Sequence, residues 1–250
     1  MSERLWLVVP AAGRGRRMGA ALPKQYLMLT GRPVLTHTLA RLHAAFPEAR
    51  LCLCLDPDDH HFDPAWVPFT DWRRVNGGAE RADSVANALD AIALEADAKD
   101  LVLVHDVARP CVTVEDLARL YAVIAEDPVG GLLAAPVADT MKRDDGAGRV
   151  AATESREGLW QALTPQGFRY GLLRRALAMA PGCGVLVTDE ASAVETLGMA
   201  PRLVAGRRDN LKITHPDDLA LAERVLAAQV ASGTTPPAII GPPVERERDT

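Results

Sequence analysis

The chain has 250 residues, of which 48% are hydrophobic and 24% are charged, as in an ordinary soluble globular protein of one α/β domain. Its formal net charge of -5 at pH 7 argues against a general nucleic-acid-binding protein, which would normally be basic. The apolar run at residues 5–10 is too short for a signal-peptide core or a membrane span. We therefore expect a cytoplasmic protein with no nucleic-acid or membrane partner.

Short apolar runs alternate with helical patterns along the chain. The expected strands are residues 5–10, 51–55, 101–104, 131–137 and 202–204. The expected helices are residues 33–46, 82–96, 114–125, 172–180, 190–197 and 216–231. This alternation predicts an α/β fold, with a Rossmann-like, mostly parallel, twisted sheet and helices on both faces.

Two segments break this alternation. Residues 138–157 carry "DDGAG" between polar flanks that tolerate β-structure, which predicts a β-hairpin arm that projects from the body. A polar hairpin of this length has little core of its own, so we expect it to pack on a partner chain. Residues 232–250 are rich in proline and charge, and we expect them to form a disordered tail after a single domain at residues 1–231.

Positive charge gathers directly after the first predicted strand, in "AAGRGRRMGAALPKQY" (residues 11–26). The dinucleotide-binding fingerprint is a poor match because the third glycine comes one residue late, and the P-loop pattern fails because its second glycine is missing. An open loop that wraps a nucleoside triphosphate fits better. Gly13 and Gly15 would let backbone N–H groups approach phosphate oxygens, and Arg17 and Lys24 are close enough in sequence to converge on them. On charge alone, a solvated surface loop stays open as an alternative.

Polar loops also follow later predicted strands, in "NGGAERADSV", "VHDVARP" and "GRRDNLKIT". Ligands of such sheets bind beyond the carboxyl ends of the strands, so we expect these loops to lie beside the first one. The expected set is residues 11–24, 76–84, 105–110 and 206–214. Asp106 directly follows a buried strand, where an acid can hold a magnesium ion that bridges phosphates. Taken singly, each loop is also compatible with an ordinary turn, a helix cap or a solvated ion pair.

Short motifs spread over the chain occur in the order and spacing of one protein family. They are "PAAGRGRRM" with "PKQY", then "GGAERADSV", "VHDVARP", "TPQGF", "TDEAS" and "DNLKIT". With them, residues 4–230 resemble the 2-C-methyl-D-erythritol 4-phosphate cytidylyltransferases of the non-mevalonate isoprenoid pathway. The resemblance implies a magnesium-dependent enzyme that joins CTP and a polyol phosphate into a CDP-polyol and releases pyrophosphate. The acceptor phosphate attacks the α-phosphorus in line, so such an enzyme supplies positioning and charge stabilisation.

The resemblance also implies roles for individual residues. Stabilisation of the pentacoordinate transition state falls to Arg17 and Lys24, with Arg156 and Lys212 as further catalytic residues. The implied CTP contacts are Ala11, Ala12, Gly13, Gly15, Gly78, Arg81 and Ser84. The implied acceptor contacts are Asp106, Arg109, Thr140, Arg156, Thr188, Asp209 and Lys212, with Asp106 also the metal ligand. In the family the arm swaps across a homodimer, which implies that residues 138–157 carry Arg156 to the acceptor site of the other subunit.

Two alternatives stay open. A ribitol 5-phosphate cytidylyltransferase shares the fold and nearly all of the CTP motifs, so only the acceptor contacts separate it from the first interpretation. A non-catalytic nucleotide-binding dimer is disfavoured, because the charged residues that only a transition state needs are all present. The chain departs from the family pattern at Val107, where "HDAARP" usually has alanine, and we expect a slightly narrower base pocket.

Overall fold

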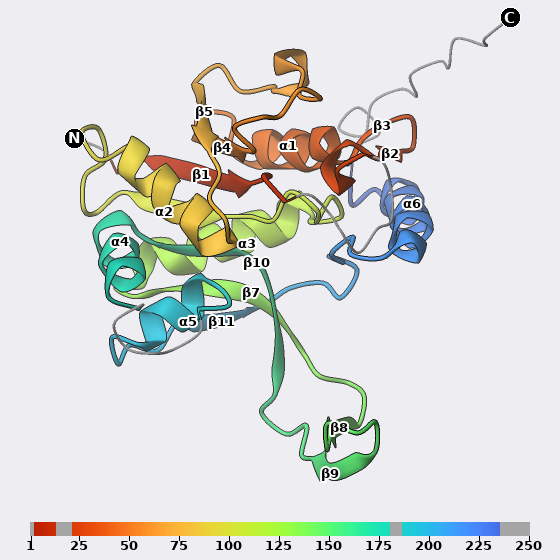
Figure 1. Ribbon diagram of the computed structural model, residues 1–250. Coiled ribbons are helices and arrows are strands. Elements are labelled where there is room, and N and C mark those ends of the chain that lie inside the picture. Colours follow the sequence, from red (N-terminus) through yellow and green to blue (C-terminus); the bar gives the residue numbers. More distant parts are fainter. Residues whose placement is uncertain (1–2, 14–21, 181–186, 236–250) are drawn as a thin grey trace, which may run out of the picture.

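The fold is built around one twisted sheet. The structure is a computed structural model that describes residues 3–13, 22–180 and 187–235. Its 7-stranded sheet has the order β11-β7-β10-β6-β1-β4-β5 (Figure 1). The strands are β1 (Leu5–Pro10), β4 (Arg50–Leu55), β5 (Trp72–Asn76), β6 (Leu101–Val104), β7 (Gly130–Pro136), β10 (Trp160–Arg169) and β11 (Arg202–Ala205). Neighbouring strands are parallel except where β10 meets β6 and β7, which confirms the predicted mostly parallel α/β fold.

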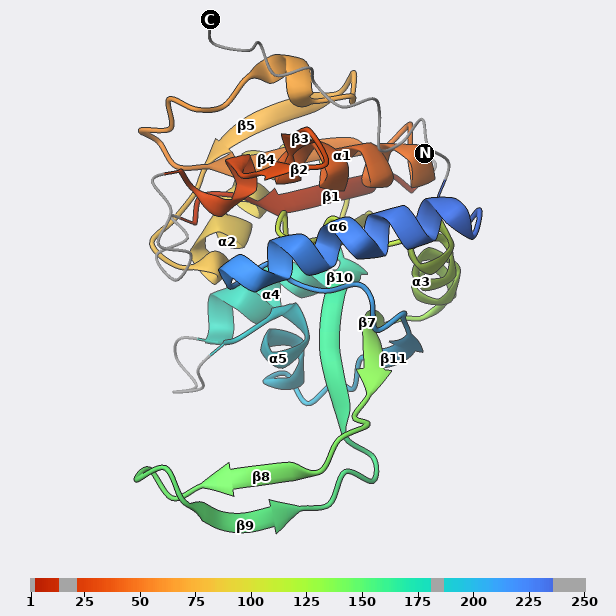
Figure 2. The same ribbon diagram turned by 90° about the vertical axis from the view of Figure 1, so that its right-hand side faces the viewer.

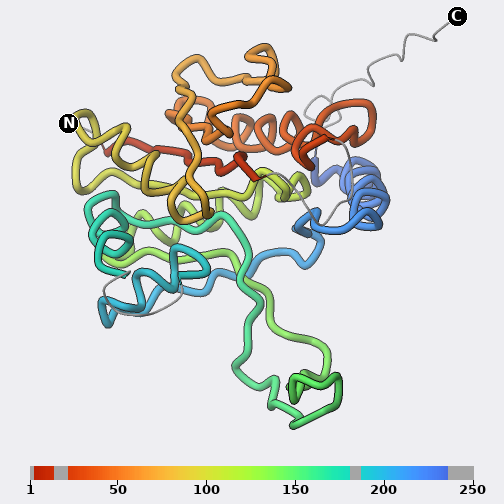
Figure 3. Tube along the Cα trace, viewed as in Figure 1, coloured from red at the N-terminus to blue at the C-terminus, as the bar shows by residue number. Residues whose placement is uncertain are grey.

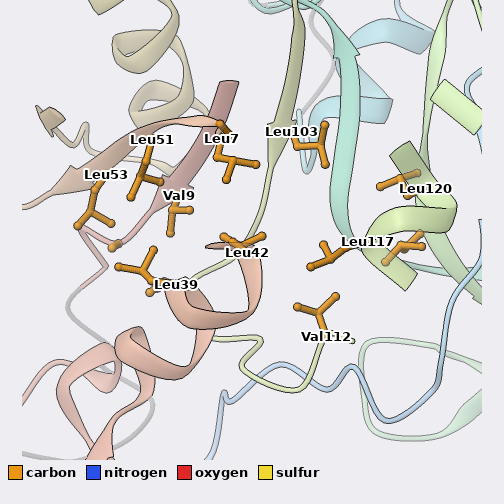
Figure 4. Packing of buried hydrophobic residues seen from close by; sticks show 14 of the residues in the cluster. Leu7, Val9, Leu39, Leu42, Leu51, Leu53, Leu103, Val112, Leu117 and Leu120 are labelled. Atoms are coloured by element: carbon orange, nitrogen blue, oxygen red, sulfur yellow. The ribbon is translucent and has the colours of Figure 1, made fainter. Parts of the chain in front are cut away.

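Helices cover both faces of the sheet, because successive side chains of each buried strand point to opposite faces. Leu7 and Val9 of β1 pack with the leucines of α1 and α3 on one face (Figure 4). Trp6 and Val8 pack with α2, α4 and α5 on the other face. The helices are α1 (Val34–Ala45), α2 (Arg81–Ala91), α3 (Val114–Glu126), α4 (Tyr170–Met179), α5 (Glu190–Glu195) and α6 (Pro216–Ala231).

The last helix lies beside the segment that follows β1. Leu226 and Ala222 of α6 are buried against Leu29 of the short hairpin β2 (Met28–Leu29) and β3 (Arg32–Pro33), and against Val34 at the start of α1. Figure 3 shows this as the blue end of the chain lying next to the red and orange segment. The C-terminal helix therefore packs against the segment that directly follows the first loop (residues 11–26). Among the described residues, no helix is long and apolar enough to cross a membrane.

Two strands of the sheet were not predicted. The β5 sequence "WRRVN" lies at the sheet edge, where Arg74 and Asn76 are exposed, and it lacks the apolar run of a buried strand. The β10 sequence contains Pro165, which has no N–H for the ladder, and its pairing with β7 shifts register between Ala162 and Gln166. The predicted helices 82–96 and 190–197 end earlier, at Ala91 and Glu195, and short turns follow them.

The predicted hairpin arm is confirmed, and it projects away from the sheet (Figure 2). Its strands β8 (Met141–Asp144) and β9 (Val150–Glu154) pair antiparallel and are mostly exposed. At the tip, Gly146 and Gly148 have φ of 86° and 79°, a backbone region that favours glycine. Their N–H groups both donate to Asp144 Oδ1, at 3.1 Å each, which explains why "DDGAG" turns the chain here.

The described chain continues past the predicted domain boundary at residue 231. Thr235 is buried, and its hydroxyl accepts a hydrogen bond from Arg41 at 3.0 Å. Residues 236–250, the rest of the predicted tail, lie outside the described residues. Where the domain ends and whether the tail is disordered therefore stay predictions.

Two buried histidines predict how the stability of the fold depends on pH. Burial is the main cause that lowers the pKa of both His37 and His105 to about 4, from the ordinary value of 6.5. Between these values the unfolded chain takes up protons at both imidazoles and the folded chain does not. The free energy of unfolding therefore does not depend on these two histidines above pH 6.5, and it falls as the pH is lowered toward 4.

We expect each histidine to account for a loss of about 1–2 kcal/mol between about pH 7 and about pH 5. Urea unfolding at the two pH values measures this difference. The variant His37→Gln removes one of the two titrating groups and should show a smaller pH difference than the parent. A free energy of unfolding that is the same at both pH values would contradict this account of the two histidines.

Candidate active site

A cavity of about 330 Å³ opens at the carboxyl ends of β1 and β6. Each of the loops expected to meet there contributes to it, so that prediction is confirmed. The lining residues are Pro10, Ala11, Ala12, Gly13, Lys24, Gln25, Gly78, Ala79, Glu80, Arg81, Ser84, Asp106, Val107, Ala108 and Lys212. Of the first loop, Arg17 and Gly15 lie outside the described residues.

Asp106 is the electrostatic centre of this cavity. Its Oδ1 lies 2.8 Å from Arg81 Nε and its Oδ2 lies 2.8 Å from Lys212 Nζ. Arg109 Nε lies 3.7 Å from the same Oδ2. Burial by itself would raise the pKa of Asp106, but Arg81 and Lys212 hold that pKa far below its usual range. The carboxylate is therefore ionised, and cations surround it.

Arg81 is bound by two acids at once. Its terminal nitrogens donate to both oxygens of Glu190, at 2.6 and 2.9 Å, while Nε donates to Asp106. Glu190 is 1% exposed, and burial raises its pKa although Arg81 opposes the shift. Sequence reasoning gave Glu190 no role. Its only signal was its place in "TDEAS", since nothing in the sequence shows that its partner is Arg81.

The glycines after β5 allow two loops to meet at the nucleotide side of the cavity. A Cβ on Gly77 would lie 2.2 Å from the Cβ of Ala12, and a Cβ on Gly78 would lie 2.2 Å from the Cβ of Asp83. Both distances are too short for any larger residue. The Gly78 N–H donates to Ser84 Oγ at 3.0 Å, so the predicted nucleotide contacts Gly78 and Ser84 lie next to each other in the cavity wall.

Lys24 opens a short 3₁₀ helix, Lys24–Tyr26, that carries the first loop back into the fold. The buried Gln25 donates to the carbonyl of Ala11 at 2.7 Å, which ties this helix to the end of β1. Lys24 Nζ donates to the carbonyl of Ile213 at 3.2 Å. Ile213 follows Lys212 in the chain, so this hydrogen bond holds Lys24 beside the loop of Lys212. Both lysines line the same cavity.

His105 has a structural role. Burial lowers its pKa to about 4, so the ring is neutral near pH 7. Nε2 lies 3.2 Å from the Arg109 carbonyl, which requires the proton there, and Nδ1 then accepts from Thr164 Oγ1 at 3.0 Å. Thr164 Oγ1 in turn accepts the Asp106 N–H at 3.1 Å. The imidazole thereby fixes the loop that carries Asp106.

The remaining predicted acceptor residues are not in the cavity lining. Arg109 lies behind it, where its Nε is 3.7 Å from Asp106 Oδ2 and its guanidinium donates to the carbonyl of Asn210 at 2.7 Å. Thr140 and Arg156 are exposed and belong to the arm, and the arm projects away from the sheet (Figure 2). Thr188 is exposed just before α5.

Asp209 is not brought to the cavity wall. It pairs with Arg207 at 2.8 Å and accepts a hydrogen bond from Gln229 at 3.2 Å. Its place close to a metal ion or to the acceptor therefore stays a prediction. The contacts that the structure does show anchor the loop 206–214 to α6.

The cavity does not fit a bare metal ion. Among the described residues, no group of three or more His, Cys, Asp or Glu side chains is arranged to hold one. Each oxygen of Asp106 already accepts from a cation, Arg81 or Lys212, so a metal ion bound there would share the carboxylate with two positive charges. Glycine-lined backbone and convergent cations are suited to phosphate oxygens. The fold and the cavity together define an α/β protein that binds nucleoside phosphates at the carboxyl edge of its sheet.

Comparisons with known proteins identify the family within this class. The family model IspD, described as 2-C-methyl-D-erythritol 4-phosphate cytidylyltransferase, matches residues 5–228. A curated protein of that name from Chromohalobacter salexigens is 69% identical over 230 residues, or 92% of each chain. Another from Dechloromonas aromatica is 52% identical over 234 residues, covering 90% of this chain and 99% of the relative.

Solved structures agree. The crystal structure of a 4-diphosphocytidyl-2C-methyl-D-erythritol synthase superposes with a TM-score of 0.78 at 38% identity, covering 90% of this chain and 99% of that one. The chain belongs to the 2-C-methyl-D-erythritol 4-phosphate cytidylyltransferase family, and it is a nucleotidyltransferase. The family resemblance stated from the motifs is thereby confirmed.

Proposed function

We propose that this chain transfers the cytidylyl group of CTP to 2-C-methyl-D-erythritol 4-phosphate, giving CDP-methylerythritol and pyrophosphate for isoprenoid biosynthesis. One observation supports this most directly: Lys24 and Lys212 line a single cavity with the glycine loops and the ionised Asp106. An acceptor phosphate oxygen forms the new bond to the α-phosphorus, and the bond from that phosphorus to the β-phosphate oxygen breaks. The acceptor is already an anion, so the step needs no general base.

The nucleotide half of the site is proposed at the first loop and at the turn after β5. Backbone at Ala11, Ala12 and Gly13, together with Gly78 and Ser84, would hold CTP. Among the described residues, no atom lies within 4 Å of a Cβ built on Gly13. We assign Arg17, Gly15 and Lys24 to the phosphates, as the family motif implies. Arg81, the other implied CTP contact, has every nitrogen of its guanidinium paired with a carboxylate, so its influence on CTP would be indirect.

The acceptor half of the site is proposed around Asp106, Arg109 and Lys212. Lys212 would hold the acceptor phosphate, and Asp106 would orient this ammonium, which it contacts at 2.8 Å. Thr188 and Asp209 are assigned to the same half from the family motif alone. The proposed acceptor is 2-C-methyl-D-erythritol 4-phosphate, and ribitol 5-phosphate is the alternative that a direct assay has to exclude.

We propose a homodimer in which the arm of each copy completes the site of the other with Thr140 and Arg156. The exposure of apolar arm residues supports this: Met141 is 41% exposed and Val150 64% exposed. Trp160, at the base of the arm, is 38% exposed. Apolar groups of this size on a segment without its own core favour burial against a second chain.

Magnesium is the proposed metal cofactor, and it would arrive as the complex with the triphosphate of CTP. The arrangement around Asp106 supports this route better than a protein-held ion, because cations already occupy that carboxylate. A cytoplasmic location, without nucleic-acid or membrane partners, stays part of the proposal.

The variant Lys212→Ala tests the acceptor half. We expect the KM for the polyol phosphate to rise roughly tenfold to a hundredfold, as for loss of one charge-assisted hydrogen bond, while the KM for CTP stays within about twofold. Steady-state kinetics with each substrate varied in turn measures both constants. Lys99→Ala, an exposed lysine before β6, is the matched control and should behave like the parent. An unchanged acceptor KM would remove Lys212 from this role.

A further inference from the structure

A chain of ion pairs connects the cavity to a buried acid behind it. Lys212 contacts one oxygen of Asp106, and Arg81 Nε contacts the other, each at 2.8 Å. Arg81 then binds Glu190 through both of its terminal nitrogens, at 2.6 and 2.9 Å. Glu190 is 1% exposed and does not line the cavity, so it has no direct access to a substrate.

The geometry of these ion pairs fixes the orientation of the Asp106 side chain. A guanidinium held at two nitrogens by one carboxylate has its plane fixed, because the fork of Arg81 matches both oxygens of Glu190. The direction of the third donor, Nε–H, is then fixed as well, and Asp106 Oδ1 accepts that hydrogen. The conformation of Asp106 is thus set from the side remote from the cavity.

Glu190 is itself anchored to the sheet. Gln166 of β10 accepts a hydrogen bond from the N–H of Ala191 at 2.8 Å and donates one to Asp189 Oδ2 at 2.8 Å. It therefore binds the residues on both sides of Glu190. Gln166 is 1% exposed and belongs to the "TPQGF" motif, for which the reaction supplies no role. The support therefore runs from β10 through the start of α5 and Arg81 to the cavity.

We propose that Glu190 is a positioning residue of the transfer reaction, acting through Arg81 on Asp106 and Lys212. This inference rests on the proposed acceptor roles of Asp106 and Lys212. It gives Arg81 a positioning role in place of a contact to CTP. It also places the effect of Glu190 in the acceptor half of the site, since the ion-pair chain ends on Lys212.

The variant Glu190→Gln tests this, because it keeps the size of the side chain and removes its charge. We expect kcat/KM for the acceptor to fall about tenfold or more, while the KM for CTP stays within about twofold. The matched control is Glu195→Gln, an exposed acid on the same helix, which should leave both constants unchanged. Thermal unfolding of both variants shows whether they are folded at the assay temperature. A Glu190→Gln enzyme with the acceptor kinetics of the parent would overturn the proposal.

Arg81→Lys gives an independent test that keeps the positive charge. A lysine ammonium cannot hold both carboxylates in one fixed plane, so we expect a loss similar to that of Glu190→Gln. If Glu190 acts through Arg81, adding Glu190→Gln to Arg81→Lys lowers kcat/KM no further. Losses that multiply in the double variant would show that the two residues act separately and would overturn the proposal.

The variant Asp106→Asn distinguishes failure of this inference from failure of the proposed acceptor roles of Asp106 and Lys212, on which it rests. A large loss with Asp106→Asn and none with Glu190→Gln would remove only the role of Glu190. If Asp106→Asn leaves the acceptor kinetics unchanged, the proposed role of Asp106 and the inference built on it both fail.

Discussion

We expect replacement of Lys24 by alanine to lower kcat by about 10²–10³-fold and to change the KM for CTP much less. This is the expected loss for one preorganised donor whose contact strengthens as charge develops in the transition state. The structure shows why the position is preorganised. Gln25 and Tyr26, which follow Lys24, are both buried, and Pro23 before it has a restricted backbone.

Single-turnover measurements with saturating CTP test this prediction, because they report the chemical step apart from product release. Lys99→Ala serves again as the control for loss of a lysine charge. Lys24→Arg adds a graded case, since it keeps the charge and changes its geometry. Equal turnover in Lys24→Ala and the parent would rule out a transition-state role. A rise in the KM for CTP with an unchanged kcat would assign Lys24 to ground-state binding.

We expect deletion of residues 139–155 to give a folded monomer with little activity. No residue of the arm belongs to the buried apolar clusters of the described chain, so the body does not depend on it for its core. The cut ends lie together, because the guanidinium of Arg156 donates to the carbonyl of Ala138. Beyond them, the Val137 N–H donates to the Leu159 carbonyl at 3.0 Å, so the neck between β7 and β10 can close.

Size-exclusion chromatography with light scattering, thermal unfolding and activity together test the deletion. A fully active monomer would show that the arm does not complete the site.

Mixed dimers offer a sharper test without deletion. Arg156→Ala and Lys212→Ala chains, each weakly active alone, should recover up to about a quarter of the parent activity after random co-assembly, because about half of the dimers are then mixed and each mixed dimer has one intact site of its two. Failure to recover activity in verified mixed dimers would contradict completion of the site by the partner's arm.

The sequence predicted the body of the fold because most of its elements carry local signals. The apolar run of β1 and the periodicity of α6 gave the bounds that the structure has. β10 carries no such signal, since Pro165 interrupts its ladder and its pairing depends on β7. Pairing partners distant in sequence are invisible to a local pattern, which is why this antiparallel strand was missed.

For the candidate site, the sequence predicted where the residues lie but not which side chains pair with each other. Asp106 and Lys212 could be placed at one edge of the sheet, because parallel strands bring their carboxyl ends together. The sequence did not predict the ion pair between these two residues or the pairing of Arg81 with Glu190. Both depend on side-chain packing between segments more than one hundred residues apart. The roles of Arg17 and Gly15 rest on the family motif, since they lie outside the described residues.

The most direct test of the account is pyrophosphate release from CTP and magnesium, with 2-C-methyl-D-erythritol 4-phosphate or ribitol 5-phosphate added in parallel. We predict rapid release with the first acceptor and at most a small fraction of that rate with the second. A preference for ribitol 5-phosphate would keep the fold and the CTP site but contradict the proposed acceptor. No release with either acceptor would contradict the catalytic account itself and favour a nucleotide-binding dimer without activity.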